Sequence, residues 1–346
     1  MGKQKILSVG IAGYGIVGNR RRQYIDQHPH LKTVAVCDQI FSENGTLSDG
    51  TLCFNNYLNL LEEDLDILFV SLPNYMAADV TIAGLENGMH VFCEKPPGRN
   101  VEDISRVIEV ERLNPKLILK YGFNHRYHDS VQTALKIVES GELGNIIYLR
   151  GIYGKSKIIS FSNLWRGERK YAGGGILLDQ GIHMLDLMQL FCGEFEEVKS
   201  FISNKHWQHD VEDNAYAIMR DSEGRVAMLH SSATQWQHKF SLDISLTKGY
   251  LELSGILTGS KSYGEETLNI GRKDEADVGS LRSEQIKYLV DPSWEKEIGE
   301  FTDAILNEGS ILYGKSTEAL ATMKLLYRIY SADSQWNETF LMQTHD

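Results

Sequence analysis

Short apolar runs alternate with longer helical patterns over the first third of the chain. Five runs rich in β-branched residues predict strands at residues 6–12, 33–37, 66–72, 90–93 and 117–122. Between them, apolar residues recur every three or four positions, which predicts helices over residues 15–27, 76–87 and 101–112. Strands that alternate with helices are typical of a parallel sheet wound with helices. We therefore predict a doubly wound α/β domain over residues 1–123.

The pattern changes after residue 123. One helix is predicted at 129–140, where Gly141 ends it, and a second at 176–192. Apolar and polar residues then alternate in predicted strands at 197–206, 213–220, 225–233, 240–247 and 249–254, and helical patterns follow at 294–307 and 316–334. This order predicts an α+β domain over residues 124–346 with a large, mostly antiparallel open sheet. The C-terminal helices would be free to pack back on the first domain.

An open sheet of this kind has one face that its own helices leave uncovered. Alternate positions of its predicted strands, such as Ala215, Ala217 and Met219, carry apolar side chains. A second subunit is the commonest cover for such a face, so we predict a homodimer or a homotetramer assembled through this sheet.

Length, charge and cysteine usage narrow the class of protein. A chain of 346 residues, 42% of them hydrophobic, is longer than one core usually supports. Its 35 Lys and Arg against 47 Asp and Glu give a net charge of −12, which disfavours nucleic acid and anionic membranes as partners. Because the sequence has no bilayer-length apolar run, no signal-like start and only four scattered cysteines, we expect a cytoplasmic protein.

A glycine-rich turn follows the first predicted strand. Gly13-Tyr14-Gly15-Ile16-Val17-Gly18 places small residues where the turn is tight, where the backbone approaches a pyrophosphate, and where helix meets strand. Asp38 ends the second strand, 20 residues after Gly18, where a carboxylate binds ribose hydroxyls. Together they predict a Rossmann dinucleotide-binding domain. Because a carboxylate repels a 2′-phosphate, NAD is expected and NADP is less favoured, unless an arginine of the run 20–22 turns toward that site.

Two further segments carry titratable residues. Lys95 follows the fourth strand in Glu94-Lys95-Pro96, at the sheet edge where doubly wound folds bind ligands, although a solvated lysine gives the same pattern. In the helix predicted at 176–192, Asp179, His183 and Asp186 share one stripe. A histidine buried beside two carboxylates indicates either a catalytic cleft or a satisfied network that only fixes the helix. The sequence leaves both interpretations open.

The loop before this helix is rich in aromatic and cationic residues. Trp165 and Arg166 could stack on a sugar ring and bind an anionic group, and a surface loop of mixed charge has the same composition. Histidines and cysteines do not occur at the spacing of a complete metal-ligand set, so no metal is expected.

These motifs, in this order, resemble the Gfo/Idh/MocA family of oxidoreductases through essentially the whole chain. The resemblance rests on the glycine-rich turn with Asp38, Pro73-Asn74, Glu94-Lys95-Pro96, residues 122–127, and the segment from Gly173 to Asp186. Two positions depart from the family pattern. Ala77 stands where many members carry a histidine, and His125 stands within a phrase usually read as Asn-x-Arg.

The resemblance implies that Lys95 and His183 act on the reacting carbinol as an acid–base pair, while Asp179 binds substrate or orients His183. The chemistry agrees, because a histidine suits proton removal from oxygen and an ammonium stabilises a developing alkoxide. Cofactor contacts are expected from Gly13, Tyr14, Gly15, Ile16, Val17, Gly18, Asp38, Pro73, Asn74, Glu94, Lys95 and Asn124. Substrate contacts are expected from Lys95, Arg126, Trp165, Arg166, Asp179 and His183.

The resulting hypothesis is an NAD-dependent oxidoreductase that interconverts a secondary hydroxyl and a ketone on a sugar or sugar derivative, nucleotide-linked or free. An NAD-assisted, redox-neutral glycoside hydrolase is the alternative within the same family. A cofactor-sensing regulator is a third class, and it would have no need of Lys95 and His183 as an acid–base set.

Overall fold

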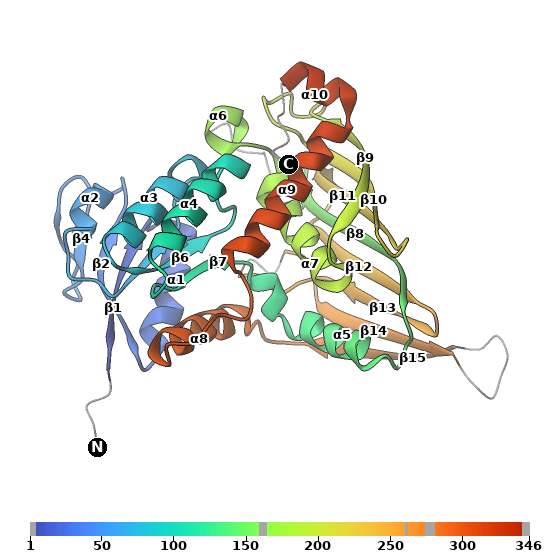
Figure 1. Ribbon diagram of the computed structural model, residues 1–346, viewed down its shortest axis with the longest axis horizontal. Helices are drawn as coiled ribbons and strands as arrows, with labels where there is room; N and C mark the ends of the chain where they lie inside the picture. Colours follow the sequence, from blue (N-terminus) through green and yellow to red (C-terminus); the bar gives the residue numbers. More distant parts are fainter. Residues whose placement is uncertain (1–4, 159–164, 260–261, 274–280, 341–346) are drawn as a thin grey trace. The chain divides into compact units, whose positions relative to one another are not determined.

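The computed structural model describes residues 5–158, 165–259, 262–273 and 281–340. The chain forms two units, the first from Met1–Asn124 and Trp294–Leu320 and the second from His125–Ser293 and Ala321–Asp346. Figure 1 labels the helices and strands of both units. Within the described ranges, no helix combines the length and apolar composition that crossing a membrane requires.

The first unit contains the predicted parallel sheet. Its strand order is β3-β4-β2-β1-β5-β6-β7, and every neighbouring pair is parallel except β3 with β4. The strands are β1 (Leu7–Ala12), β2 (Leu31–Cys37), β3 (Gly45–Thr46), β4 (Leu52–Phe54), β5 (Ile67–Val70), β6 (His90–Glu94) and β7 (Leu119–Gly122). The five predicted strands are confirmed. Strands β3 and β4 were not predicted, because two or three residues are too few to show a period.

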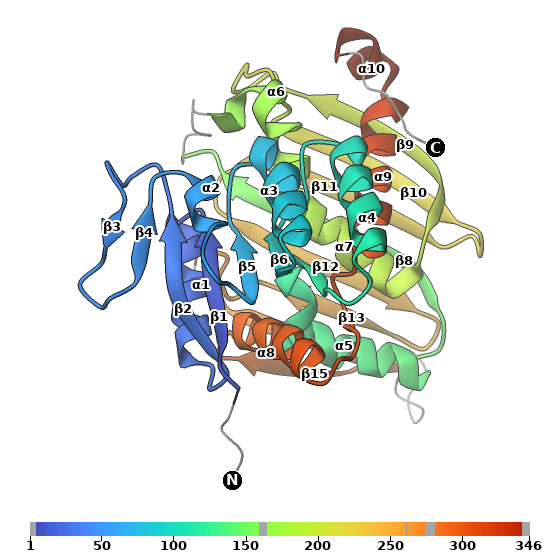
Figure 2. The ribbon, with the colours of Figure 1, turned by 60° about the vertical axis from the view of Figure 1, so that its left-hand side comes forward.

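Helices cover this sheet, and one of them comes from the far end of the chain. The helices are α1 (Ile16–Gln27), α2 (Tyr57–Leu60), α3 (Asn74–Glu86), α4 (Val101–Leu113) and α8 (Ser293–Leu306). Helix α3 packs against β5 and β6, and α4 lies beside α3 (Figure 2). The three helices predicted for this half are confirmed.

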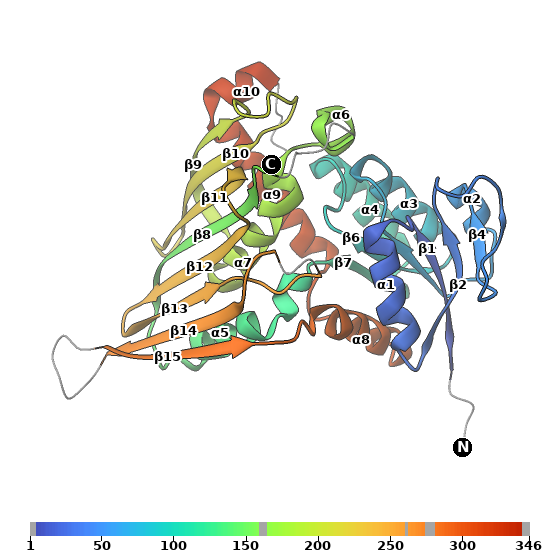
Figure 3. The ribbon, with the colours of Figure 1, turned by 180° about the vertical axis from the view of Figure 1, so that it is seen from behind.

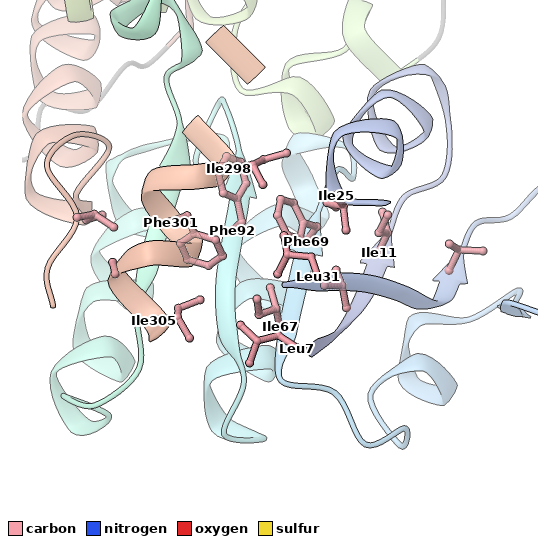
Figure 4. Close-up of a cluster of buried hydrophobic side chains, with 14 of the residues drawn as sticks. Leu7, Ile11, Ile25, Leu31, Ile67, Phe69, Phe92, Ile298, Phe301 and Ile305 are labelled. Carbon is pink, nitrogen blue, oxygen red and sulfur yellow. The ribbon is translucent and has the colours of Figure 1, made fainter. Parts of the chain in front are cut away.

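Helix α8 packs its apolar stripe against the sheet (Figure 4). Phe69 of β5 and Phe92 of β6 stack with ring centroids 4.8 Å apart, and Phe301 of α8 meets both rings edge-on, at 6.0 and 5.6 Å. Ile298 and Ile305 extend the contact. Burying each of these side chains contributes roughly 1.5–3 kcal/mol, so residues about 300 positions along the chain help to hold the N-terminal sheet together.

A charge network lies beside this core. The Arg21 guanidinium of α1 is fully buried and donates to Glu94 at 2.6 Å and to Glu297 of α8 at 2.8 Å. Its guanidinium carbon also lies 4.3 Å from the Phe92 ring centroid and 4.1 Å from that of Trp294. Two carboxylates and two aromatic faces therefore surround one cation.

Glu297 gives the first unit a predicted dependence on pH. Burial raises the pKa of its carboxyl to about 7, although the charges of Arg21 and Lys120 act to lower it. The folded chain therefore binds a proton that the unfolded chain releases above its ordinary pKa of 4.5, and the stabilisation falls as pH rises from about 4.5 to about 7. Glutamine does not titrate, so Glu297→Gln should remove this part of the pH dependence. The slope that disappears is at most about 1.4 kcal/mol of unfolding free energy per pH unit in that window. Denaturant titrations of both proteins across the window test this, and parallel curves would contradict it.

The second unit contains one large sheet, with strand order β15-β14-β13-β12-β8-β11-β10-β9 (Figure 3). Only the β8–β11 pair is parallel among its described neighbours. The strands are β8 (Ile146–Ser156), β9 (Phe195–Ser203), β10 (Asn214–Asp221), β11 (Val226–Gln235), β12 (Lys239–Leu246), β13 (Gly249–Ser254), β14 (Glu266–Lys273) and β15 (Leu281–Tyr288). The mostly antiparallel sheet is confirmed. Strand β8 was not predicted, because Ile147 and Tyr148 are both exposed and break the alternation. Strands β14 and β15 were not predicted either.

One face of this sheet is covered by helices of the same unit. They include α5 (Asp129–Ser140), α7 (Ile182–Cys192), α9 (Ser316–Ala332) and α10 (Ser334–Phe340), and α6 (Arg169–Ala172) precedes α7. A Cβ on Gly151 of β8 would lie 2.7 Å from Met184 and 2.5 Å from Met188 of α7, so the glycine allows close packing there. A side chain at this position would displace the ends of both methionine side chains.

The residues that the sequence analysis offered for the uncovered face are on the wrong side. Ala215, Ala217 and Met219 are buried, at 0%, 4% and 0% exposure, on the face that packs inward. The alternate residues Tyr216 and Ile218 are 44% and 57% exposed. Period two correctly predicted the strand, but apolar character alone could not say which set of positions faces outward, because both sets are apolar.

Candidate functional site

The glycine-rich turn between β1 and α1 has the tight geometry that its sequence predicts. Gly13 has φ +93°, and a Cβ there would lie 2.3 Å from the carbonyl oxygen of Ser71. A Cβ on Gly18 would lie 1.9 Å from the carbonyl oxygen of Gly13, so helix and turn touch at that point. Gly15, in contrast, faces open space and starts α1 without a side-chain cap.

This turn fits a dinucleotide. The first-turn N–H groups of α1 have no side-chain acceptor at the N-cap, and uncapped amides at a helix N-terminus bind phosphate groups. Ile16 and Val17 at the turn are exposed. The open side of Gly15 leaves room for the pyrophosphate where a larger residue would block it.

Asp38 stands at the end of β2, next to this turn. Its carboxylate accepts hydrogen bonds from the backbone N–H of Tyr14 at 2.7 Å and of Ile40 at 3.1 Å. The carboxylate is thus fixed against the glycine-rich turn, as a group that binds ribose hydroxyls must be.

The arginines after the turn have acidic and hydroxyl partners of their own. Arg21 is buried between Glu94 and Glu297. Arg22 donates to the Tyr14 hydroxyl at 2.7 Å, to Thr51 and to Asp49. The sequence left NADP open in case an arginine of the run 20–22 turned toward the 2′-phosphate. The contacts of Arg21 and Arg22 do not support that case.

The other expected cofactor residues of the first unit lie at the carboxyl ends of its strands. Pro73 caps α3, and Asn74 is buried in its first turn. Glu94 ends β6 and accepts from Arg21, and Lys95 follows it, partly buried, before a cis bond to Pro96. Asn124 begins the 3-10 turn η1 (Asn124–Tyr127) after β7. These positions match the ligand-binding edge of a doubly wound sheet, and their contacts to a cofactor remain predictions.

In the second unit, the predicted helix at 176–192 begins as a π-helical turn, η3 (Leu177–Gly181), and continues as α7. Asp179 lies in the π turn and His183 at the start of α7, so the regular 3.6-residue stripe assumed from the sequence does not describe them. π-Helical turns are rare and frequently occur at functional sites.

Glu212 holds this turn in place, and the sequence analysis did not identify it. Its buried carboxylate accepts from the N–H of Gly175 at 2.8 Å, from the N–H of Leu177 at 2.9 Å and from the Tyr330 hydroxyl at 2.7 Å. A Cβ on Gly175 would lie 2.0 Å from the Glu212 carbonyl oxygen, which explains the glycine. Burial raises the pKa of this carboxyl, while its three donors act to lower it. Glu212 therefore caps the segment that carries Asp179 and His183.

The predicted acidic stripe divides into two parts. Asp186 is fully buried and accepts two hydrogen bonds from Arg126, at 2.8 and 2.6 Å, and Arg126 itself is only 3% exposed. Asp179 is partly exposed and accepts from the amide of Gln180 at 3.2 Å. The network interpretation thus describes Asp186 with Arg126, whereas Asp179 keeps access to solvent. The predicted contact of Arg126 with substrate is not tested by this geometry.

Aromatic and histidine side chains surround His183, and most were not identified from the sequence. His125 of η1 stacks on His183 with ring centroids 3.7 Å apart and 12° between the planes. The hydroxyl of Tyr153, on β8, lies 3.0 Å from His125 Nε2. The ring of Tyr263 meets that of Tyr153 edge-on, with centroids 5.3 Å apart. Burial, then the neighbouring Asp179 charge, raise the pKa of Tyr263. Only the departure at His125 from the family phrase gave a signal for this cluster.

Trp165 and Arg166 lie in the 3-10 turn η2 (Trp165–Gly167), and the Arg166 guanidinium carbon is 4.3 Å from the Trp165 ring centroid. The two side chains therefore stack on each other, and their contact with a sugar stays a prediction. Residues 163 and 164 of the same loop lie outside the described residues. Across the part of the chain that the structure describes, no group of three His, Cys, Asp or Glu side chains is arranged to hold a metal ion.

Comparisons with known proteins agree with this geometry. Residues 7–122 match the model of the oxidoreductase family with an NAD-binding Rossmann fold, and residues 131–252 match the GFO/IDH/MocA C-terminal domain. A D-glucoside 3-dehydrogenase of Escherichia coli is 33% identical over 255 residues, 65% of this chain and 70% of that protein. A 2,7-anhydro-N-acetylneuraminate hydratase of Mediterraneibacter gnavus is 26% identical over 90% of this chain and 80% of that protein.

The solved structures extend the fold match over nearly the whole chain. A levoglucosan dehydrogenase in complex with NADH and L-sorbose superposes with a TM-score of 0.82 at 20% identity, covering 95% of this chain and 97% of that one. At this identity the match concerns the fold alone. With both family models, the NAD-binding turn and the relative at 33% identity in agreement, the chain belongs to the Gfo/Idh/MocA family of NAD-binding oxidoreductases.

Proposed function

We propose that this protein is an NAD-dependent dehydrogenase that interconverts a secondary hydroxyl and a ketone on a sugar or sugar derivative. The observation that carries the proposal is the segment from Asp179 to His183, which presents a partly exposed carboxylate and a buried imidazole. Glu212 caps the start of its π-helical turn through the N–H groups of Gly175 and Leu177. A histidine and a carboxylate held in this way suit proton transfer and hydroxyl binding. The relative named D-glucoside 3-dehydrogenase supports a sugar as the substrate class.

Each residue has a distinct role in this proposal. Bound at the turn between β1 and α1, NAD would supply the acceptor for the hydride that leaves the carbinol carbon. His183 takes the proton that the hydroxyl oxygen must lose, and the Lys95 ammonium stabilises the alkoxide that develops there. Asp179 binds neighbouring hydroxyls of the sugar or sets the tautomer of His183.

The test is direct. The purified protein is incubated with NAD and a panel of free sugars, glycosides, anhydrosugars, cyclitols and nucleotide-linked sugars, and NADH is measured together with the ketone product. We expect one class to give NADH and ketone in equal amounts. If no member of the panel gives NADH while the protein still binds NAD, the dehydrogenase proposal fails.

A redox-neutral reaction is the second candidate, and one comparison favours it. The relative that covers 90% of this chain is named a hydratase, and hydration neither oxidises nor reduces a substrate overall. Product formation without net NADH, but with a requirement for added or bound NAD, would select this candidate over the first.

NAD is expected to bind more tightly than NADP. Asp38 is held against the glycine-rich turn by the Tyr14 and Ile40 amides, and its charge opposes a 2′-phosphate. The double substitution Asp38→Ser with Gln39→Arg should narrow or reverse the preference, because it removes the carboxylate and supplies a cation. Calorimetric titration of both cofactors into both proteins measures this. Equal or tighter NADP binding by the unchanged protein would refute the assignment.

We also propose a homodimer or homotetramer assembled through the outward face of the large sheet. Phe201, Tyr216 and His230 lie opposite one another on three adjacent strands, and Phe201 is 78% exposed. Ile218 is also exposed on this face. Tyr216→Lys with Ile218→Lys should produce monomers without loss of secondary structure. Light scattering at micromolar concentration decides, and a monomeric unchanged protein would contradict the proposal.

A further inference from the structure

The 3-10 turn η1 brings a second histidine against the proposed acid–base residue. His125 is 4% exposed, and its ring lies nearly parallel to that of His183, with centroids 3.7 Å apart. At this distance the two rings are in van der Waals contact across their faces. Both residues belong to the second unit, so the contact lies within one unit.

His125 is itself held from several sides. Its Nε2 lies 3.0 Å from the Tyr153 hydroxyl, and Phe240 of β12 meets both rings edge-on, His125 at 6.0 Å and Tyr153 at 5.5 Å. The His128 ring adds an edge contact at 5.6 Å. Burial raises the pKa of the Tyr153 phenol well above its ordinary value, so this hydroxyl keeps its proton as a hydrogen-bonding group. The ring of His125 therefore has one fixed plane.

The fixed ring of His125 restricts rotation of the His183 imidazole, and that rotation determines where the ring nitrogens point. The torsion about the Cβ–Cγ bond of histidine is broad, so packing must choose the direction in which the ring nitrogens point. A flat ring in face contact blocks rotation of the His183 imidazole out of its plane. Proton transfer depends on that direction, and small misplacements of a catalytic group cost rate steeply.

We propose that His125, anchored by Tyr153, is a positioning residue that fixes the ring plane of His183. The inference rests on the proposed function, in which His183 moves the substrate proton. His125 acts through the face of its ring, and Tyr153 acts by keeping that ring in place.

The variants separate the ring from its hydrogen bond. His125→Ala should lower kcat about tenfold to a hundredfold, with little change in NAD affinity, because it removes the stacked face. His125→Phe keeps a flat ring and should restore kcat to within a few fold of the unchanged protein. Tyr153→Phe keeps its own ring but releases His125, so its kcat should lie between these two. His206→Ala, an exposed histidine of the same unit, is the matched control.

A readout without turnover tests the same contact. In protein with nitrogen-labelled histidine, the His183 ring signals are assigned by their loss in His183→Ala. These signals should shift in His125→Ala, because the neighbouring ring current disappears, and stay in place in His206→Ala. Unshifted signals in a folded His125→Ala would overturn the proposed contact.

The kinetic outcomes are equally decisive. Turnover per folded His125→Ala molecule equal to that of the unchanged protein would reduce His125 to a packing residue. A His125→Phe variant as slow as His125→Ala would also overturn the proposal, because the flat face alone would then not suffice. Failure of the underlying function is distinguishable, since it would show as normal hydride transfer in His183→Ala itself.

Discussion

Lys95→Met and His183→Ala are each expected to lower kcat by about two to four orders of magnitude, while NAD affinity stays nearly unchanged. Both side chains are proposed to act on the substrate oxygen, and the cofactor's phosphates are expected at the turn between β1 and α1. Single-turnover hydride transfer and cofactor titration on the same preparations measure the two effects separately. The double variant should be scarcely slower than either single one, because residues that act as a unit are not additive.

Asp179→Asn serves as the graded comparison for these two substitutions. Its loss should be intermediate, in KM if the carboxylate binds hydroxyls and in kcat if it sets the tautomer of His183. If Asp179, His183 and Asp186 form only a buried structural network, His183→Ala should not lower kcat. In that case folded His183→Ala would transfer hydride at a near-normal rate, and only its melting temperature would fall.

Arg21→Met is expected to lower the free energy of unfolding by about 3–5 kcal/mol. The guanidinium is fully buried, and its removal leaves the Glu94 and Glu297 carboxylates facing each other without their shared cation. Methionine fills much of the same volume, so the loss reports the charge and its hydrogen bonds more than a cavity. Denaturant unfolding followed by circular dichroism provides the measurement.

Arg106→Met is the control for a solvated ion pair in the same unit. Arg106 and its nearest partner Asp79 are 46% and 57% exposed, and exposed pairs contribute at most about 1 kcal/mol. Its second partner, Asp103, lies farther away at 3.9 Å and keeps Arg99 at 2.9 Å. Equal losses from the two substitutions would show that burial of the Arg21 network does not stabilise the first unit. A loss of NAD affinity in Arg21→Met, with stability unchanged, would instead assign Arg21 to cofactor binding through Glu94.

Much of the fold follows from patterns local in the chain. The strands β1, β2, β5, β6 and β7 and the helices between them were predictable because a side chain's direction repeats every two residues in a strand and about every 3.6 in a helix. The same rule failed at β8, whose adjacent Ile147 and Tyr148 are both exposed, and at β3, which has two residues. It also could not say which face of β10 points outward, since Ala217 and Ile218 are both apolar.

The motifs of the candidate site were predictable from the sequence, but the residues that hold those motifs in place were not. Local patterns predicted the glycine-rich turn, Asp38, Lys95 and His183, because each lies at a strand end or near a helix start. Glu212, which caps the π-helical turn of Asp179, comes after the helix it caps, so no N-cap pattern in the sequence could indicate it. His125 was visible only as a departure from a family phrase.

The sequence by itself determined the order of the elements, the two kinds of sheet and the cofactor-binding turn, because each depends on residues within a few positions of one another. The tertiary structure decided which buried polar and charged groups meet. Arg21 and Glu297 are 276 residues apart, and His128 and Glu266, joined at 2.8 Å, are 138 apart. A buried charge must find its partner wherever packing brings one, since leaving it unpaired is too costly, and packing is a property of the whole chain. The stack of His125 on His183 also depends on packing, because it joins residues of η1 and α7 that no local pattern brings together.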